Sequence, residues 1–233
     1  MKRKYDPSRL APLALCLGLI ALRSNAAIWN ESGDAGQLLG SAQQVTGSGS
    51  LTEINGNIDG GGDRDVFLIR ITDPLDFSFT VTATGNDGNN ADTILALFNA
   101  NGIGIVYNDN IDAVNLKSRL DSTVNFVSNA GAGDYYLAIM GGGQQFVDVN
   151  AQAIWLEEEP WEVQKGPDGP STTDIFNGYF GVGGANVGSY TISITGGVTP
   201  VPEPAYYGLA FAIMGMAVAG FRYRNSRKAA VNR

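Results

Sequence analysis

A two-residue alternation of apolar and polar side chains between residues 77 and 84 constrains the fold more than any other feature. The apolar positions are Phe77, Phe79, Val81 and Ala83, and the polar positions are Ser78, Thr80, Thr82 and Thr84. Because successive side chains of a strand point to opposite faces, this pattern predicts a strand with one buried face. Similar short segments predict further strands at 51–58, 65–71, 94–98, 103–107, 122–128, 135–139 and 190–195.

Turns rich in glycine, asparagine and aspartate separate these segments, and none of the segments shows a convincing amphipathic helical pattern. Segment 94–98 is apolar on both faces, which indicates a central strand. We therefore expect an all-β fold over residues 51–197, an antiparallel β-sandwich of jelly-roll-like form. Residues 27–50 are expected to be a loose lead-in with at most one edge strand. Residues 141–187 lack a strand rhythm and are expected to be a long insertion loop.

The N-terminus has the three parts of a secretory signal. Lys2, Arg3 and Lys4 precede an apolar core at 10–22, and Ser24-Asn25-Ala26 fits a small-x-small cleavage site. Residues 1–26 are therefore expected to be a signal peptide that the general secretion machinery recognises. The single cysteine, Cys16, lies inside this segment, and the chain contains no histidine. Disulfides, thiolate metal sites and Ser-His-Asp catalysis are thereby excluded for the mature protein.

The C-terminus also has three parts. Val201-Pro202-Glu203-Pro204 closes a linker at 198–204, which the prolines should hold extended. An uncharged apolar run follows at 205–221 and is long enough for one transmembrane helix. The tail at 222–233 is basic, which places it in the cytoplasm and the preceding domain on the other side of the membrane.

This order of Pro202-Glu203-Pro204, apolar helix and basic end resembles the PEP-CTERM sorting signal of Gram-negative bacteria. The resemblance implies processing by an exosortase, a membrane-embedded cysteine peptidase, and passage to the cell surface or outside the cell. It also implies an exopolysaccharide-rich or biofilm matrix as the setting. The alternative is an ordinary C-terminal membrane anchor with a chance pair of prolines.

The region 27–200 is strongly acidic, with 21 acidic and 5 basic residues. It should therefore repel nucleic acid and could attract divalent cations, although solubility of an exported protein would also explain the charge. Several of its motifs resemble the bacterial pre-peptidase C-terminal domain, a small β-sandwich of secreted proteins. They are residues 62–67, 92–98, 101–102, 108–110, 133–137 and 188–192. The resemblance is diffuse and departs from the family at Asp109-Asn110 and in the long insertion.

Sandwich domains of this kind often bind calcium through acidic loops. The candidate ligands are Asp63, Asp65, Asp87, Asp92, Asp109 and Asp112. Calcium takes six to eight oxygen ligands, which carboxylates, amides and backbone carbonyls supply. The alternative is that these residues cap turns and strand ends.

Two tryptophans and a tyrosine in the insertion suggest a second kind of site. Trp155, Trp161 and Tyr179 could form a stacking surface for a carbohydrate or a protein, or they could pin the insertion onto the sandwich. Glu157, Glu158, Glu159 and Glu162 supply carboxylates without the spacing that a two-carboxylate hydrolase needs. We therefore expect a non-enzymatic exported cell-surface or extracellular-matrix protein, with a calcium-assisted binding module on a simple membrane anchor as the alternative.

Overall fold

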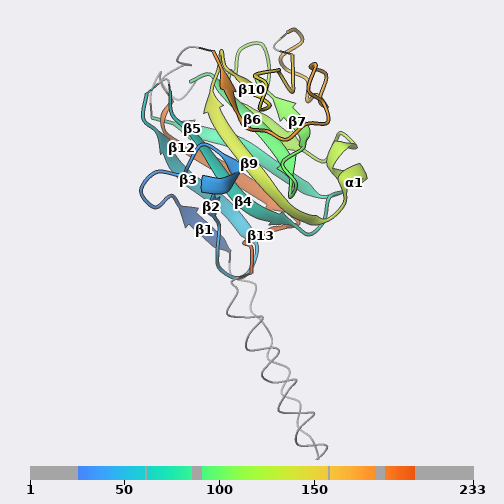
Figure 1. Cartoon of the computed structure of the whole chain (residues 1–233). Coiled ribbons are helices and arrows are strands. Elements are labelled where there is room, and N and C mark those ends of the chain that lie inside the picture. The colour runs from blue at the N-terminus through green and yellow to red at the C-terminus, as the bar shows by residue number, and fades with distance from the viewer. Residues whose placement is uncertain (1–25, 61, 86–90, 157, 182–186, 203–233) are drawn as a thin grey trace, which may run out of the picture.

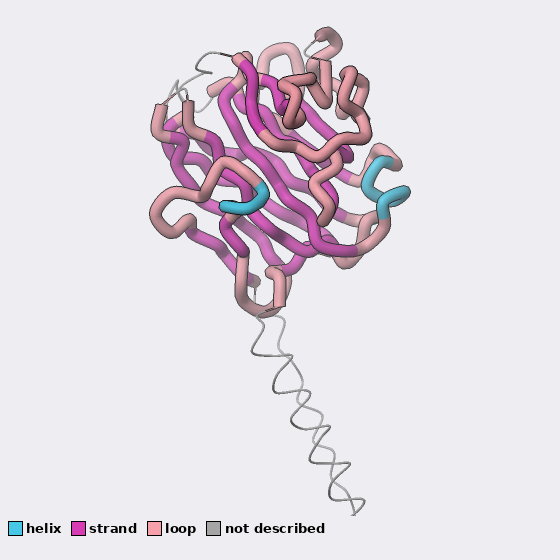
Figure 2. The backbone as a smooth tube through the Cα atoms, in the orientation of Figure 1, coloured by secondary structure: helices cyan, strands magenta, loops and turns pink. Residues whose placement is uncertain are grey.

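The computed structural model describes residues 26–60, 62–85, 91–156, 158–181 and 187–202. This part of the chain is mostly strand, as Figure 2 shows. The strands are β1 (Ala27–Asn30), β2 (Gln43–Gln44), β3 (Leu51–Ile58), β4 (Arg64–Ile71), β5 (Phe77–Thr84), β6 (Thr93–Asn99), β7 (Gly104–Asn108), β8 (Arg119–Asp121), β9 (Gly133–Gly141), β10 (Gln145–Val147), β11 (Gly178–Phe180), β12 (Gly188–Gly196) and β13 (Val198–Thr199). A short helix, α1 (Phe126–Ala130), and a 3₁₀ turn at Leu39–Ser41 complete the elements.

Two large sheets form the body of the protein (Figure 1). The first sheet has the order β1-β3-β12-β5-β8, and the second has the order β13-β4-β9-β6-β7 with β2 also paired to β4. The long neighbouring strands are antiparallel, whereas the short strands β1 and β2 pair in parallel with β3 and β4. The expectation of an all-β fold is confirmed at this level.

The main core lies between the two sheets. The alternation in β5 buries Phe77, Phe79 and Val81, but a register shift near the end of the strand leaves Ala83 exposed and Thr84 buried. The first sheet also contributes Ile54, Ile192 and Ile194, and the second contributes Phe67, Ile69, Leu95, Leu97, Leu137 and Ile139. Burial of these apolar surfaces is the dominant force holding the sheets together.

The second sheet is covered on its outer face as well. Val66, Ile94, Ala96, Phe98 and Met140 turn away from the main core and pack with residues of the 141–187 insertion. The insertion contributes Phe146, Ile154, Trp155 and Phe176 to this contact. The aromatic side chains at this contact form one cluster, which we call the aromatic layer: Phe98, Tyr107, Phe146, Trp155, Phe176 and Tyr179. Residues of β6 are consequently buried on both faces, which confirms it as a central strand. In Figure 1 the insertion, in gold and orange, gathers at the end of the molecule where β6, β7 and β10 lie.

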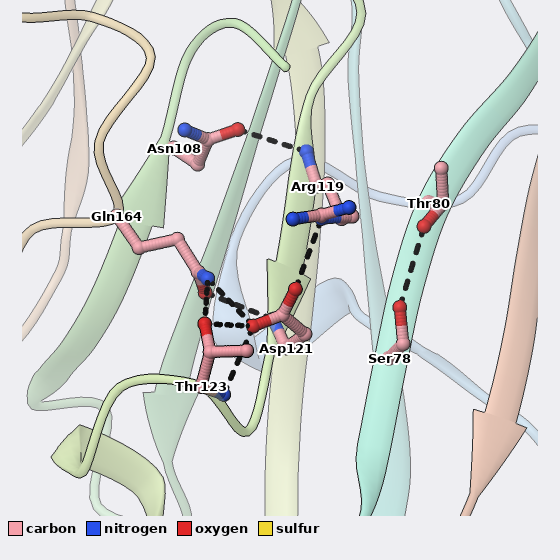
Figure 3. Close-up of polar contacts among 7 residues, drawn as sticks. All are labelled: Ser78, Thr80, Asn108, Arg119, Asp121, Thr123 and Gln164. Carbon is pink, nitrogen blue, oxygen red and sulfur yellow. Dashed lines mark hydrogen bonds and ion pairs between the residues drawn. The ribbon is translucent and has the colours of Figure 1, made fainter. Parts of the chain in front are cut away.

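The insertion has some regular structure of its own, because β10 and β11 form a separate two-stranded antiparallel sheet. Polar contacts also tie it to the rest of the protein, and one of them is a pair of hydrogen bonds between Asp121 and Gln164 (Figure 3). The Asp121 amide donates to Gln164 Oε1 at 2.8 Å, and Gln164 Nε2 donates back to the Asp121 carboxylate at 2.8 Å. Burial would raise the pKa of Asp121, but the hydrogen bonds from Thr123 and Gln164 and the charge of Arg119 together lower it.

The lead-in at 27–50 is part of the sandwich rather than a loose segment. β1 forms the edge of the first sheet, and Ala35 and Val45 are buried in the main core. The C-terminal boundary of the sandwich also differs from the expected one. β13 pairs with the end of β4, and the Val201 amide donates to Val45 O at 2.8 Å. The ordered sandwich therefore runs to Val201, four residues beyond the expected boundary at 197, and only the end of 198–204 remains for a linker.

The strand expected at 122–128 is wrong. The Asp121 carboxylate accepts a hydrogen bond from the Thr123 amide at 3.0 Å, which turns the chain directly after the short strand β8. α1 then buries Val127 and ends at Gly131, whose φ of 88° favours glycine. A local side-chain hydrogen bond has thus replaced the extended conformation that Val124 and Phe126 suggested.

No helix among the described residues is long and apolar enough to cross a membrane. The expected transmembrane segment at 205–221, the basic tail, Glu203, Pro204 and nearly all of the expected signal peptide lie outside those residues.

Candidate metal centre

Three carboxylates meet at one end of the sandwich, and we call this group the N-terminal acidic site. Glu31 directly follows β1, Asp34 lies in the next turn, and Asp65 is on β4. One oxygen from each carboxylate lies within 4.8 Å of the others. The site therefore joins the segment after β1, which belongs to the first sheet, to a strand of the second sheet.

Asp65 is the buried member of this site, and its side chain is 0% exposed. Its Oδ2 accepts a hydrogen bond from the Tyr190 hydroxyl at 2.7 Å, whereas its Oδ1 accepts none from any described residue. Burial raises the pKa of Asp65 to about 8, against the effect of the Tyr190 bond, and the charges of Glu31, Asp63 and Asp34 add to the rise. A buried carboxylate oxygen without a donor is costly unless a positive partner compensates it.

Backbone hydrogen bonds hold Glu31 in place. Its Oε1 accepts from the Ala35 amide at 2.6 Å and its Oε2 from the Asn57 amide at 2.8 Å. Burial raises the pKa of Glu31, and these two bonds partly offset the rise. Gly56 is necessary here, because a Cβ at this position would collide with the Tyr190 hydroxyl and with Glu31. Glu31 can therefore approach β3 and Tyr190 only where the strand lacks a side chain.

An open cavity of about 430 Å³ adjoins the site. Asp34, Asp59 and Asp63 line it, together with Gln37, Asn57 and three glycines. Burial raises the pKa of Asp34, and the charges of Asp63 and Asp59 raise it further. Arg64 adjoins the cavity, because its guanidinium donates to Gly62 O and Gln37 Oε1, but the three carboxylates outnumber this one cation, so the cavity favours a positive ligand.

Asp63 has a different role from Asp65, although both were candidate calcium ligands. Its carboxylate accepts hydrogen bonds from the amides of Asp59 at 2.7 Å and Arg64 at 2.8 Å. These bonds shape the turn before β4. The Arg64 guanidinium lies 4.3 Å from the ring centroid of Tyr179, and its Nη1 donates to Gly62 O and to Gln37 Oε1 beside the cavity.

A second group of acidic and amide side chains lies at the insertion, and we call it the insertion pocket. It is a cavity of about 580 Å³ lined by Asp92, Asp109, Asn110, Ala113, Leu116, Gly143, Glu159, Trp161 and Glu162. Burial raises the pKa of Asp92, and a hydrogen bond with Asp109 partly offsets this rise. The structure therefore divides the predicted calcium ligands into two groups, with Asp65 in one and Asp92 and Asp109 in the other.

The remaining candidate ligands do not join either group. Asp112 is exposed, and its Oδ1 accepts hydrogen bonds from the amides of Val114 at 2.9 Å and Asn115 at 2.8 Å. It caps a turn, as the alternative interpretation of these residues held. Asp87 lies outside the described residues.

The expected stacking surface does not include Trp155, which is 2% exposed inside the aromatic layer. Tyr179 packs beside Phe146 and Phe176, and its hydroxyl donates to Gln37 O at 2.7 Å. Trp161 alone of the three presents much surface, with 37% exposed. The interpretation in which aromatic side chains pin the insertion onto the sandwich therefore holds for Trp155 and Tyr179.

Sequence reasoning missed Glu31 and Asp34, because they lie in the segment expected to be a loose lead-in. It also missed Asn110 as a possible ligand beside Asp109. The acidic pair around Gly33, directly after the alternating segment Ala27–Asn30, was the one available signal. That signal gives no indication that Asp65 lies beside Glu31 and Asp34 in the folded protein.

The fold and these two groups of oxygen ligands define the class of protein as an all-β protein of sandwich type with candidate cation sites. No protein-family model matches the chain, and no curated protein matches it.

Proposed function

We propose that this chain is a non-enzymatic exported surface or matrix protein whose β-sandwich binds calcium at the N-terminal acidic site. The observation that carries the proposal is the fully buried Asp65, whose Oδ1 has no donor among the described residues and whose carboxylate lies together with those of Glu31 and Asp34. A calcium ion there would give that oxygen a partner and would neutralise three converging carboxylates.

Calcium fits this ligand set better than the other common metals. All three side chains offer oxygen, and the mature region has neither cysteine nor histidine for a softer metal. Calcium accepts six to eight oxygen ligands in flexible geometry, whereas magnesium demands a near-ideal octahedron. The three carboxylates leave coordination positions that water from the adjoining cavity can fill.

The ion would have a structural effect because its ligands come from different parts of the chain. Glu31 and Asp34 follow the edge strand β1, and Asp65 is at the start of β4 in the other sheet. Calcium would therefore fasten the N-terminal end of the mature chain to the sandwich. Exported proteins commonly meet millimolar calcium, where even weak sites are filled.

Export and sorting rest on the two ends of the chain. The sandwich holds Val201 through the hydrogen bond from its backbone amide to Val45 O, and the Pro-Glu-Pro motif begins at the next residue. A sorting enzyme would thus meet the motif directly outside the folded domain. We infer that an exosortase-like peptidase recognises Pro202-Glu203-Pro204, that the apolar run 205–221 holds the protein in the inner membrane in transit, and that the mature domain reaches an exopolysaccharide-rich surface. The jelly-roll-like arrangement and the kinship with pre-peptidase C-terminal domains belong to the same proposal.

Calcium titration of the full chain in detergent tests the metal site. We expect saturable binding heat and a rise in melting temperature, because an ion that binds only the folded state stabilises it by mass action. Asp112→Asn is the matched control, since Asp112 caps an exposed turn and should leave both signals unchanged. Absence of both heat and melting shift in the unsubstituted chain would remove the site.

Intact mass of the exported protein from its own host tests sorting. We expect a chain that begins near Ala27 and ends near Pro204, because the signal peptide and the C-terminal signal should both be removed. Alanine substitution of the Pro-Glu-Pro motif should leave the tail attached. A wild-type protein that retains residues 222–233 at the cell surface would instead identify the tail as a simple anchor.

A further inference from the structure

The insertion pocket collects oxygen ligands from two neighbouring strands and the insertion. Asp92 directly precedes β6, and Asp109 and Asn110 directly follow β7. Because β6 and β7 are antiparallel, with Leu95 opposite Asn108, these three side chains lie at the same end of the second sheet. Glu159, Trp161 and Glu162 of the insertion line the same cavity.

Two members of this group have an unsatisfied polar atom in a buried position. Asn110 is only 7% exposed, and its Oδ1 accepts no hydrogen bond from any described residue. The same is true of Oδ1 of Asp92, which lines the cavity beside it. Native proteins rarely leave such buried acceptors without a partner, so each one needs an explanation.

We propose that the insertion pocket is a second divalent-cation site, with Asp92, Asp109 and Asn110 as ligands and Glu159 or Glu162 completing it from the insertion. Two carboxylates and an amide oxygen are the ligand types that calcium takes in loop sites. A cation would satisfy the acceptors of Asp92 and Asn110 at once. No basic side chain lines the pocket among the described residues.

The local structure positions these ligands closely. The Asn110 amide donates to Trp161 O at 3.1 Å, and Asn108 Nδ2 donates to the same oxygen at 3.3 Å. The insertion is therefore already held against the loop that carries two of the ligands. Gly142 contributes by its missing side chain, because a Cβ there would collide with the Asp92 carboxylate.

The consequence differs from that of the N-terminal acidic site. A cation in the insertion pocket would join residues 159–162 to the ends of β6 and β7, and so would fasten the insertion over the aromatic layer. It would not touch the segment after β1, so the two sites can be filled and emptied separately.

Terbium luminescence of the full chain in detergent tests this inference. Terbium replaces calcium at oxygen sites and emits when a nearby indole transfers energy to it, and Trp161 lines this pocket. In an Asp65→Asn background, which lacks a ligand of the first site, we expect indole-sensitised emission that added calcium reverses. Trp161→Phe should remove the emission while calcium binding in the titration persists.

Ligand variants separate this site from the first one. Asn110→Ala and Asp92→Ala should each abolish the emission in that background, whereas Asn110→Asp, which keeps an oxygen ligand, should retain it. Cation-free melting temperatures show whether each variant is folded, and Asp112→Asn is the unchanged control. If the Asp65→Asn chain binds neither terbium nor calcium, the second site is overturned while the first stands. If the unsubstituted chain binds one ion that is lost with Asn110 but not with Asp65, the N-terminal acidic site falls and the insertion pocket stands.

Discussion

Replacing Trp155 with alanine is expected to lower the free energy of unfolding by about 3–5 kcal/mol, the usual cost of truncating a buried large aromatic side chain. Trp155 is 2% exposed. The centroid of its ring lies 5.4 Å from the ring centroid of Phe98, 5.7 Å from that of Tyr107 and 5.8 Å from that of Phe146. Its loss would leave a cavity between the insertion and the second sheet. Urea unfolding of the full chain in detergent, with calcium present, measures the change.

The control for this prediction is Trp161→Ala in the same segment. Trp161 is 37% exposed, so its truncation should cost about 1 kcal/mol or less. Because the insertion covers the outer face of the second sheet, Trp155→Ala should also expose Phe146 and Phe98 to solvent. A change within about 1 kcal/mol for Trp155→Ala would mean that the insertion is not part of the cooperative core.

The second large effect is expected at Asp65, where asparagine should remove the part of the calcium stabilisation that comes from the N-terminal acidic site. Without divalent cations, Asp65→Asn should be at least as stable as the unsubstituted chain. The amide oxygen can still accept from Tyr190, and no buried carboxylate remains to be neutralised. With calcium at roughly one hundred times its Kd, the unsubstituted chain should gain about 2.7 kcal/mol from binding at this site. Asp65→Asn should lack that gain, and paired unfolding curves in calcium and in chelator measure the difference.

The change in stability caused by Asp65→Asn, compared between calcium and chelator, shows whether Asp65 acts as a metal ligand. If Asp65 were only a structural hydrogen-bond acceptor, Asp65→Asn would shift stability equally in calcium and in chelator. Equal shifts in both conditions would therefore contradict the metal role. Glu31→Gln offers an independent check, because it changes a second ligand and leaves the Tyr190 bond to Asp65 in place.

Local patterns predicted most of the strands. The alternation at 77–84 became β5, and the apolar segment at 94–98 lies within β6, buried on both faces. These predictions succeed because side-chain periodicity follows directly from strand geometry. The two wrong expectations have different causes, one local in the sequence and one that depends on tertiary packing. Asp121 turns the chain before residues 122–128, and residues 141–187 gain their order only by packing on a face of the second sheet that no pattern reveals.

The sequence by itself determined the all-β class, the acidic character of residues 27–200 and the absence of cysteine and histidine from that range, because these depend on composition and short periodicity. It also supplied the signals at the two ends on which export and sorting are proposed. Only the tertiary structure decided which acidic residues meet. Glu31 and Asp65 are 34 positions apart and come together because β1 and β4 lie at the same end of opposite sheets. Strand order and register set such distances, and neither is encoded in the spacing of the ligands along the chain.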